Sequence, residues 1–315
     1  MNPVLRTDHL KVHHDTARGT LKAVDGIDLS IAEGETLGLV GESGCGKSTL
    51  ARCIVGISRP TDGSIAIQGV SGGRGRAARL DRAQTVQMIF QDPSGALNPR
   101  LRVDRIIREP LDVNNVGDRS ERRDKALKIA REVGLSDYHL DRMPHELSGG
   151  QRQRVSIARA LALNPKLLVC DEAVSALDVS VQAQVLNLLV DLQKDLGLSY
   201  LFISHDLAVV RYVSHRIAVM YMGRIVEIGP AEDVWRGRLH PYTRALTASI
   251  PDEAARRDTG ELLEGDVPSP VSPPSGCAFR TRCRFARQQC AAERPELRRV
   301  GTHEVACHFA ETISD

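Results

Sequence analysis

Residues 41–49 read GESGCGKST, and the sequence on either side can be interpreted from this stretch. It fits the pattern G-x-x-x-x-G-K-S/T, in which glycines let successive backbone N–H groups turn toward phosphate oxygens. Lys47 would reach the β- and γ-phosphates of a nucleotide, and the Ser48 hydroxyl would bind Mg²⁺. The residues predicted to surround the phosphates are Gly41, Glu42, Ser43, Gly44, Cys45, Gly46, Lys47, Ser48 and Thr49.

The segments that flank this loop predict a strand before it and a helix after it. Thr36–Val40 is a short apolar run of the kind that forms a buried parallel strand. Residues 47–57 carry apolar side chains at helical spacing. A strand–loop–helix unit places the helix N-terminus, with its partial positive charge, at the phosphates. We therefore expect an α/β protein with a nucleotide site at this loop.

Length and composition allow one large domain with an appendage. The chain has 315 residues, 42% of them hydrophobic and 26% charged, with a net charge of +2. No run of about 18 apolar residues is present that could cross a membrane. The N-terminal segment MNPVLRTDHLKVHHD is polar and unlike a signal peptide. We expect a cytoplasmic protein that reaches a membrane only through a partner.

Polar side chains follow two further predicted strands. Residues 85–90 read TVQMIF and end at Gln91, and residues 166–170 read KLLVC and end at Asp171 and Glu172. The carboxyl ends of strands in an α/β sheet form the edge where ligands bind. There, Gln91 would contact Mg²⁺ or its water, Asp171 would hold Mg²⁺ through water, and Glu172 would orient the attacking water.

A third predicted strand and a serine–glycine stretch complete the candidate site. Ser199–Ser204 is apolar and precedes His205, which could hydrogen-bond a γ-phosphate. Residues 147–151 read LSGGQ and stand before a helical run, with Ser148 as the expected N-cap. The two glycines allow backbone N–H groups to approach an anion.

Other segments set out the expected architecture. Residues 20–33 alternate like an antiparallel strand, and 216–228 resemble a hairpin. Residues 71–83 are expected to form a flexible basic loop. Residues 101–143 have helical periodicity, and residues 99–164 are expected to form a helical subdomain inserted into the sheet domain. Residues 180–196 predict a long amphipathic helix.

The order of these motifs resembles that of the ABC ATPases over about residues 5–235. The resemblance implies a P-loop core with a mixed sheet, an N-terminal antiparallel β-subdomain and an inserted helical subdomain. It also implies that two such domains face each other head to tail. ATP on Lys47 of one domain would be covered by the LSGGQ of the other. The residues that would serve the partner's nucleotide are Ser148, Gly149, Gly150 and Gln151.

The residue that stacks on adenine is the main departure from the family pattern. The family places an aromatic residue in the N-terminal strand, whereas the first aromatic residue here is Phe90. By alignment, His14 occupies that position, with His13 as the second choice. Both histidines could instead be solvated surface residues.

The segment after the ATPase core resembles the oligopeptide and dipeptide importers, on the strength of HPYT at 240–243 and RAL at 244–246. The resemblance implies an ATPase subunit at the cytoplasmic face of the inner membrane. Its partners would be a second ATPase subunit, by family habit a paralogue, two transmembrane permease subunits and an extracytoplasmic binding protein. Glutathione and nickel complexes remain alternative substrates. A soluble ABC ATPase of DNA repair or translation is a distant alternative, because this chain has one nucleotide domain and no coiled-coil insertion.

Four cysteines near the end have the spacing C-x5-C-x6-C-x16-C. In a reducing compartment such clusters indicate metal more often than disulfides. Zinc sites favour C-x2–4-C pairs, which are absent here, and the wider spacing suits an iron–sulfur (4Fe-4S) cluster. Some peptide-importer ATPases carry one. Zinc and no metal are the alternatives. The cysteines concerned are Cys277, Cys283, Cys290 and Cys307.

Seven arginines lie between Arg280 and Arg299 and could offset the charge of such a cluster. As a nucleic-acid patch they would lack interleaved tryptophan or tyrosine, so no nucleic-acid partner is expected. The predicted organisation is a nucleotide-binding domain over residues 1–235 and an extension over 236–315. This extension would contain a Pro-rich linker at 264–277 and carry the four cysteines.

Overall fold

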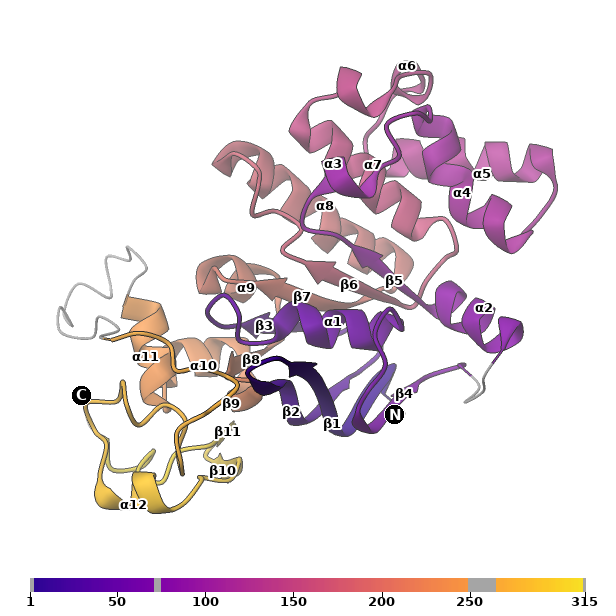
Figure 1. The fold of residues 1–315 in the computed structure, drawn as a ribbon. Helices are drawn as coiled ribbons and strands as arrows, with labels where there is room; N and C mark the ends of the chain where they lie inside the picture. Colours follow the sequence, from indigo (N-terminus) through magenta and orange to yellow (C-terminus); the bar gives the residue numbers. More distant parts are fainter. Residues whose placement is uncertain (1–2, 71–74, 249–264, 314–315) are drawn as a thin grey trace. The chain divides into compact units, whose positions relative to one another are not determined.

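The computed structural model describes residues 3–70, 75–248 and 265–313 (Figure 1). Its strands are β1 (Leu5–Thr16), β2 (Gly19–Ile31), β3 (Thr36–Val40), β4 (Asp62–Ile67), β5 (Val86–Ile89), β6 (Leu167–Asp171), β7 (Ser199–Ser204), β8 (Arg216–Tyr221), β9 (Arg224–Pro230), β10 (Arg298–Val300) and β11 (His303–Val305). Its helices are α1 (Lys47–Val55), α2 (Arg76–Thr85), α3 (Pro93–Ala96), α4 (Val103–Asn114), α5 (Arg119–Glu132), α6 (Asp137–Leu140), the 3₁₀ turn Pro144–Glu146, α7 (Gly149–Leu161), α8 (Val179–Leu196), α9 (Leu207–Val213), α10 (Ala231–Gly237), α11 (Pro241–Ala248) and α12 (Gln288–Ala292).

The chain forms two compact units, and each is described by itself. Unit 1 comprises the described parts of Met1–Arg6, Ser30–Glu35 and Ala66–Leu201. Unit 2 comprises the described parts of Thr7–Leu29, Thr36–Ile65 and Phe202–Asp315. The predicted division of the chain at residue 235 stays a prediction.

Unit 1 contains a pair of short parallel strands and a group of helices. Strand β5 pairs with β6 in parallel, from Val86 opposite Leu167 to Ile89 opposite Cys170. Every residue of β6 is buried. Helices α3 to α7 lie together in Figure 1, and α4, α5 and α7 pack on one another. A helical subdomain is therefore present in the part of the chain where the sequence predicts one.

The loop expected over residues 71–83 is not observed at 76–83. Residues 76–85 form helix α2, and residues 71–74 lie outside the described residues. The glycines at 72 and 73 suggested a loop, but the sequence that follows, RAARLDRAQT, is rich in alanine, leucine and arginine, which favour helix. The strand expected from residue 85 begins at Val86, because Thr85 ends α2 and its hydroxyl donates to the Asp81 carbonyl at 2.7 Å.

In unit 2 the order of paired strands is β10-β11-β9-β8-β3. Strand β3 is parallel to β8, and β8 and β9 form the predicted antiparallel hairpin. Helix α9 covers β3 closely at Gly38, where a Cβ would collide with Val210. Strand β11 pairs antiparallel with β9, so the C-terminal segment extends the same sheet.

Most residues of β1, β2 and β4 also belong to unit 2 and form a three-stranded sheet in the order β2-β1-β4. Only two residues join β1 to β2, which makes the pair an antiparallel hairpin. The strand expected over 20–33 is observed as Gly19–Ile31. Within the described ranges, no helix combines the length and apolar character needed to cross a membrane.

Candidate active site

The loop at 41–49 curves around the ammonium group of Lys47. This side chain is only 4% exposed, and its Nζ donates to the carbonyls of Gly41 at 2.7 Å and Glu42 at 3.0 Å. Ser43 and Gly44 are exposed on the open side of the loop. The loop therefore presents a buried cation beneath an accessible edge, as the phosphates of a nucleotide require.

Two glycines of the loop are required by close backbone approach. Gly46 has φ 109° and is the N-cap of α1, and a Cβ there would collide with the carbonyl of Ala23. Gly41 has φ 156°, and a Cβ there would meet the carbonyl of Met220. Ser48 and Thr49 lie in the first turn of α1, where free helix N–H groups favour an anion. The expected strand–loop–helix is confirmed, with the helix ending at Val55.

In unit 1 the structure brings together two of the predicted catalytic residues. The side-chain amide of Gln91 donates to Oε2 of Glu172 at 2.9 Å. Asp171, the last residue of β6, is 5% exposed. Glu172 has φ 49°, a left-handed conformation that costs a non-glycine residue on the order of 1 kcal/mol or more and is typical of functional positions. Ser175 secures the turn through its N–H and hydroxyl, both donating to the Glu172 carbonyl.

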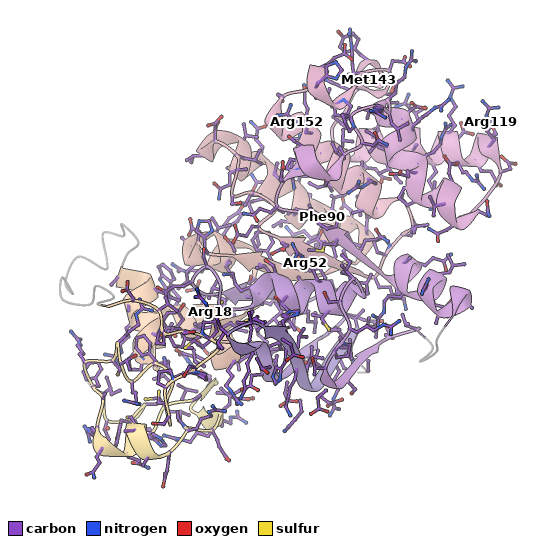
Figure 2. The ribbon with its side chains drawn as sticks, in the orientation of Figure 1. Arg18, Arg52, Phe90, Arg119, Met143 and Arg152 are labelled. Atoms are coloured by element: carbon purple, nitrogen blue, oxygen red, sulfur yellow. The ribbon has the colours of Figure 1, made fainter. Side chains whose placement is uncertain are left out.

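The LSGGQ stretch opens helix α7, and Ser148 is its N-cap as expected. Ser148 Oγ accepts from the Gln151 N–H at 3.3 Å, and Gln151 Oε1 accepts from the Ser148 N–H at 2.9 Å. The Gln151 side chain also contacts His139 Nε2 at 3.1 Å. Arg152, labelled in Figure 2, donates to the Leu147 carbonyl at 2.6 Å. Gln151 therefore fixes the geometry of the helix start through its own side chain.

The predicted site residues fall into both units. The loop at 41–49 and His205 belong to unit 2, whereas Gln91, Asp171, Glu172 and the LSGGQ stretch belong to unit 1. His205 follows β7 and is exposed. It precedes Asp206, whose carboxylate caps α9 by accepting from the N–H groups of Ala208 and Val209.

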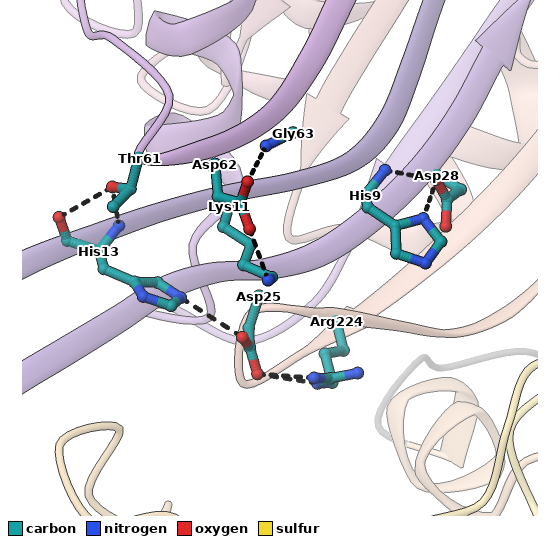
Figure 3. Close-up of polar contacts among 9 residues, drawn as sticks. All are labelled: His9, Lys11, His13, Asp25, Asp28, Thr61, Asp62, Gly63 and Arg224. Atoms are coloured by element: carbon teal, nitrogen blue, oxygen red, sulfur yellow. Dashed lines mark hydrogen bonds and ion pairs between the residues drawn. The ribbon is translucent and has the colours of Figure 1, made fainter.

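The two candidate adenine-stacking histidines differ in their surroundings. His13 Nε2 lies 3.3 Å from Asp25 Oδ1, and its backbone N–H donates to Thr61 Oγ1 (Figure 3). Asp25 is in turn bonded by the guanidinium of Arg224 at 2.7 Å. Arg224 and His13 hold the pKa of the Asp25 carboxyl below its usual value, although burial, the largest influence, acts in the opposite direction. His14 is exposed, so it is the better candidate of the two.

All four clustered cysteines are free thiols that line one small cavity. Phe279, Phe285 and Phe309 line it as well, which makes the cavity apolar. The backbone N–H of Cys277 donates to the Cys290 carbonyl at 2.8 Å. Burial raises the pKa of Cys277, Cys307 and Cys283, the last to about 11. Neighbouring thiols raise the pKa of Cys277, Cys283 and Cys307 further.

A site for a single metal ion is not observed there. Among the described residues, no three or more His, Cys, Asp or Glu side chains are grouped closely enough to hold one ion. The arginines nearby have other partners: Arg280 donates to the Ser275 carbonyl, and Arg298 pairs with Glu311. What the four thiols offer is a shared apolar cavity with four sulfur donors.

Sequence reasoning missed two residues that contact the loop. The Tyr242 hydroxyl accepts from the Glu42 N–H at 2.7 Å, and Arg282 pairs with the Glu42 carboxylate at 2.6 Å. Tyr242 belongs to the HPYT segment and Arg282 to the arginine-rich segment, but nothing in their local sequence indicates a contact 200 or 240 residues away.

Comparisons with known proteins agree with this geometry. The family model described as ABC transporter matches residues 24–175. The model described as oligopeptide/dipeptide transporter, C-terminal region, matches residues 226–290. The chain is 50% identical to the oligopeptide transport ATP-binding protein OppF of Escherichia coli (strain K12), over 96% of this chain and 95% of that protein. It is 47% identical to the di/tripeptide transport ATP-binding protein DppF of Pseudomonas aeruginosa (strain UCBPP-PA14), over 99% of both chains.

Solved structures confirm the fold class. The dimeric structure of MJ0796, a bacterial ABC transporter cassette, matches with a TM-score of 0.66 at 28% identity and covers 72% of this chain and 98% of that one. The structure of cbiO1 from Clostridium perfringens, part of an ABC transporter complex, matches with a TM-score of 0.68 at 26% identity and covers 82% of this chain and all of that one. The chain belongs to the ABC transporter family, among the ATP-binding proteins of its oligopeptide and dipeptide transport branch.

Proposed function

We propose that this chain is the ATP-hydrolysing subunit of an ABC importer for di- and oligopeptides. The observation that carries the proposal is the likeness to peptide-transport ATP-binding proteins, which covers the ATPase core and the C-terminal region together. The alternatives of glutathione or nickel complexes would use the same ATPase. The soluble ABC ATPase of DNA repair or translation finds no support among the relatives named above.

The residues of the loop at 41–49 fit the phosphates of Mg·ATP. The Lys47 ammonium now bonds two loop carbonyls, and the β- and γ-phosphates are stronger partners for it. The Ser48 hydroxyl would bind Mg²⁺ directly, Asp171 would act through its water, and Gln91 would contact Mg²⁺ or its water. Glu172 would orient the attacking water, and His205 would contact the γ-phosphate.

The LSGGQ stretch of this chain would serve a second ATPase subunit. Ser148, Gly149 and Gly150, with Gln151 closing the cap, would cover the γ-phosphate on the partner's loop. Binding energy from that contact exists only while the γ-phosphate is present, so hydrolysis would release the pair. We propose a paralogue as the second ATPase, two transmembrane permease subunits, an extracytoplasmic binding protein, and a peripheral location at the cytoplasmic face of the inner membrane.

Peptide uptake in living cells tests the proposed function. A strain that lacks this gene and is complemented with the wild-type chain should take up labelled di- and tripeptides. Complementation with Lys47→Ala should give no uptake, because the phosphates lose their charged partner. Peptide uptake that is equal with the empty vector and with the wild-type chain would contradict the proposal.

We also propose that Cys277, Cys283, Cys290 and Cys307 hold a 4Fe-4S cluster. Four sulfur donors on one apolar cavity fit the requirement of such a cluster, whose four irons each need a ligand. The cluster would cross-link the C-terminal segment by joining positions 277, 283, 290 and 307 through iron–thiolate bonds. Anaerobically purified chain should be brown, with four irons per chain and absorbance near roughly 400 nm. Colourless protein, or protein that contains zinc, would contradict the proposal.

A further inference from the structure

Glu42, the second residue of the phosphate loop, makes hydrogen bonds through its backbone and an ion pair through its carboxylate. Its N–H donates to the Tyr242 hydroxyl at 2.7 Å, and its carbonyl accepts from Lys47 Nζ at 3.0 Å. Both carboxylate oxygens accept from the guanidinium of Arg282, at 2.6 and 3.0 Å. Tyr242 and Arg282 both lie in the C-terminal part of the chain, so that part contacts the nucleotide loop directly.

The Arg282–Glu42 pair has the geometry of a strong interaction. Two parallel N–H···O bonds join the guanidinium to the carboxylate, an arrangement that fixes direction as well as distance. The Arg282 side chain is 4% exposed and that of Glu42 24% exposed, so solvent screens the pair little. The Glu42 carboxylate is the main cause that raises the pKa of Arg282 above its ordinary value.

Tyr242 packs against the rings of Tyr221 and Phe279, and we call these three residues the aromatic cluster. The ring centroid of Tyr242 lies 4.7 Å from that of Tyr221 and 5.4 Å from that of Phe279. Phe279 also accepts, through its carbonyl, a hydrogen bond from the Arg282 N–H at 3.0 Å. The same cluster therefore positions the hydroxyl and the guanidinium that contact Glu42.

Positioning Glu42 has a consequence for the loop. Glu42 follows Gly41 and precedes the exposed pair Ser43 and Gly44, and glycines leave the backbone conformationally free. The Glu42 carbonyl is one of the two loop carbonyls that accept a hydrogen bond from Lys47 Nζ. A loop that is already ordered loses less conformational entropy when it binds a ligand, so its affinity is higher.

We infer that Tyr242 and Arg282 are positioning residues for nucleotide binding, which act by holding Glu42 so that the phosphate loop is ordered before ATP arrives. This inference rests on the proposed ATPase function and extends the nucleotide site to the C-terminal part of the chain. A contact with a merely structural role would stabilise the fold and leave the affinity for ATP unchanged.

Three substitutions in the full-length chain separate these roles. Arg282→Met removes the ion pair, and Tyr242→Phe removes only the hydroxyl while keeping the ring. Arg299→Met is the matched control, because Arg299 is exposed and its guanidinium donates to the Gly301 carbonyl within its own turn. Calorimetric titration with Mg·ATP gives Kd, and urea unfolding without nucleotide gives stability.

We expect Arg282→Met to raise Kd for Mg·ATP about tenfold and Tyr242→Phe about threefold, with Arg299→Met within about twofold of wild type. Arg282→Lys should recover part of the affinity, because an ammonium restores the charge but not the two parallel bonds. In the Glu42→Gln background, Arg282→Met should have a smaller effect. If Arg282→Met does not fold, the Kd of Tyr242→Phe for Mg·ATP tests the inference by itself.

Two results would overturn the inference, and they differ from each other. Wild-type Kd in folded Tyr242→Phe and Arg282→Met, even with lowered stability, would refute it and leave the proposed function intact. A wild-type chain that does not bind Mg·ATP at all would refute the proposed function and this inference together.

Discussion

Glu172 occupies a left-handed backbone position at the end of β6, with the Gln91 amide on its carboxylate. In our proposal this carboxylate orients the attacking water. Glu172→Gln should lower the rate of phosphate release by the assembled transporter at least about a hundredfold, since a positioned base contributes that much. Mg·ATP affinity should persist, because Lys47 and Ser48 are unchanged.

The control for this substitution is Glu304→Gln, which changes an exposed carboxylate on β11. Phosphate release should be normal in that variant. Near-normal phosphate release by Glu172→Gln would show that another group orients the water.

The start of helix α7 allows a prediction at the scale of packed elements. A Cβ on Gly150 would lie 2.5 Å from Val181 Cγ1 of α8, whereas a Cβ on Gly149 would lie 3.7 Å from Leu177 Cδ2, an ordinary contact. Gly150→Ala should therefore lower the free energy of unfolding by about 1–3 kcal/mol through overpacking. Gly149→Ala, the matched control, should be neutral or slightly stabilising because alanine favours helix.

Urea unfolding of both variants checks this prediction. Adding Val181→Ala to Gly150→Ala should recover most of the lost stability, since it removes the colliding methyl group. Equal stabilities for the two glycine variants would contradict the packing described here.

Helix α11 is preceded by a buried histidine that makes stability depend on pH. Burial lowers the pKa of His240 to about 4, although the charge of Glu227 opposes the shift. The His240 Nδ1 accepts from the Tyr242 N–H at 3.0 Å, which also requires the neutral ring. The stabilising contribution is complete above the unfolded pKa of about 6.5 and is lost as pH falls toward 4.

The expected loss in the free energy of unfolding is about 2 kcal/mol by pH 5, and up to about 3 kcal/mol below pH 4. Urea unfolding of the wild type and of His240→Asn at pH 7.5, 6 and 5 measures it, because the asparagine carbonyl keeps an acceptor without titrating. The stability difference between the two proteins should shrink as pH falls. A difference that is constant with pH would show that His240 does not titrate in this way.

The scale of elements also shows where sequence patterns suffice. Strand β3 and the hairpin β8–β9 were predictable because their side chains carry an uninterrupted apolar signal or a turn signal. Helix α2 was not predictable from the pattern, because the glycines before it suggested a loop and most of its own residues are polar. The intrinsic helix propensity of its residues explains why this segment is a helix, but the neighbouring glycines made that propensity hard to recognise in the sequence.

At the scale of the whole chain, patterns could indicate only candidate site residues that belong to local motifs, such as Lys47 and Glu172. They could not predict contacts between distant segments. Glu227 of β9 is fully buried, and its carboxylate accepts from the N–H of His240 at 3.0 Å and lies 2.9 Å from His303 Nδ1. Such contacts, like that of Arg282 with Glu42, depend on the three-dimensional path of the chain.

The central claim of this account is that ATP hydrolysis on this chain drives peptide uptake. Proteoliposomes that contain the complete transporter, enclose Mg·ATP and receive the binding protein outside test it directly, with a labelled dipeptide as substrate. We predict uptake that requires enclosed ATP and is abolished by Glu172→Gln in this chain. Peptide uptake at the wild-type rate without ATP, or with Glu172→Gln, would contradict the claim.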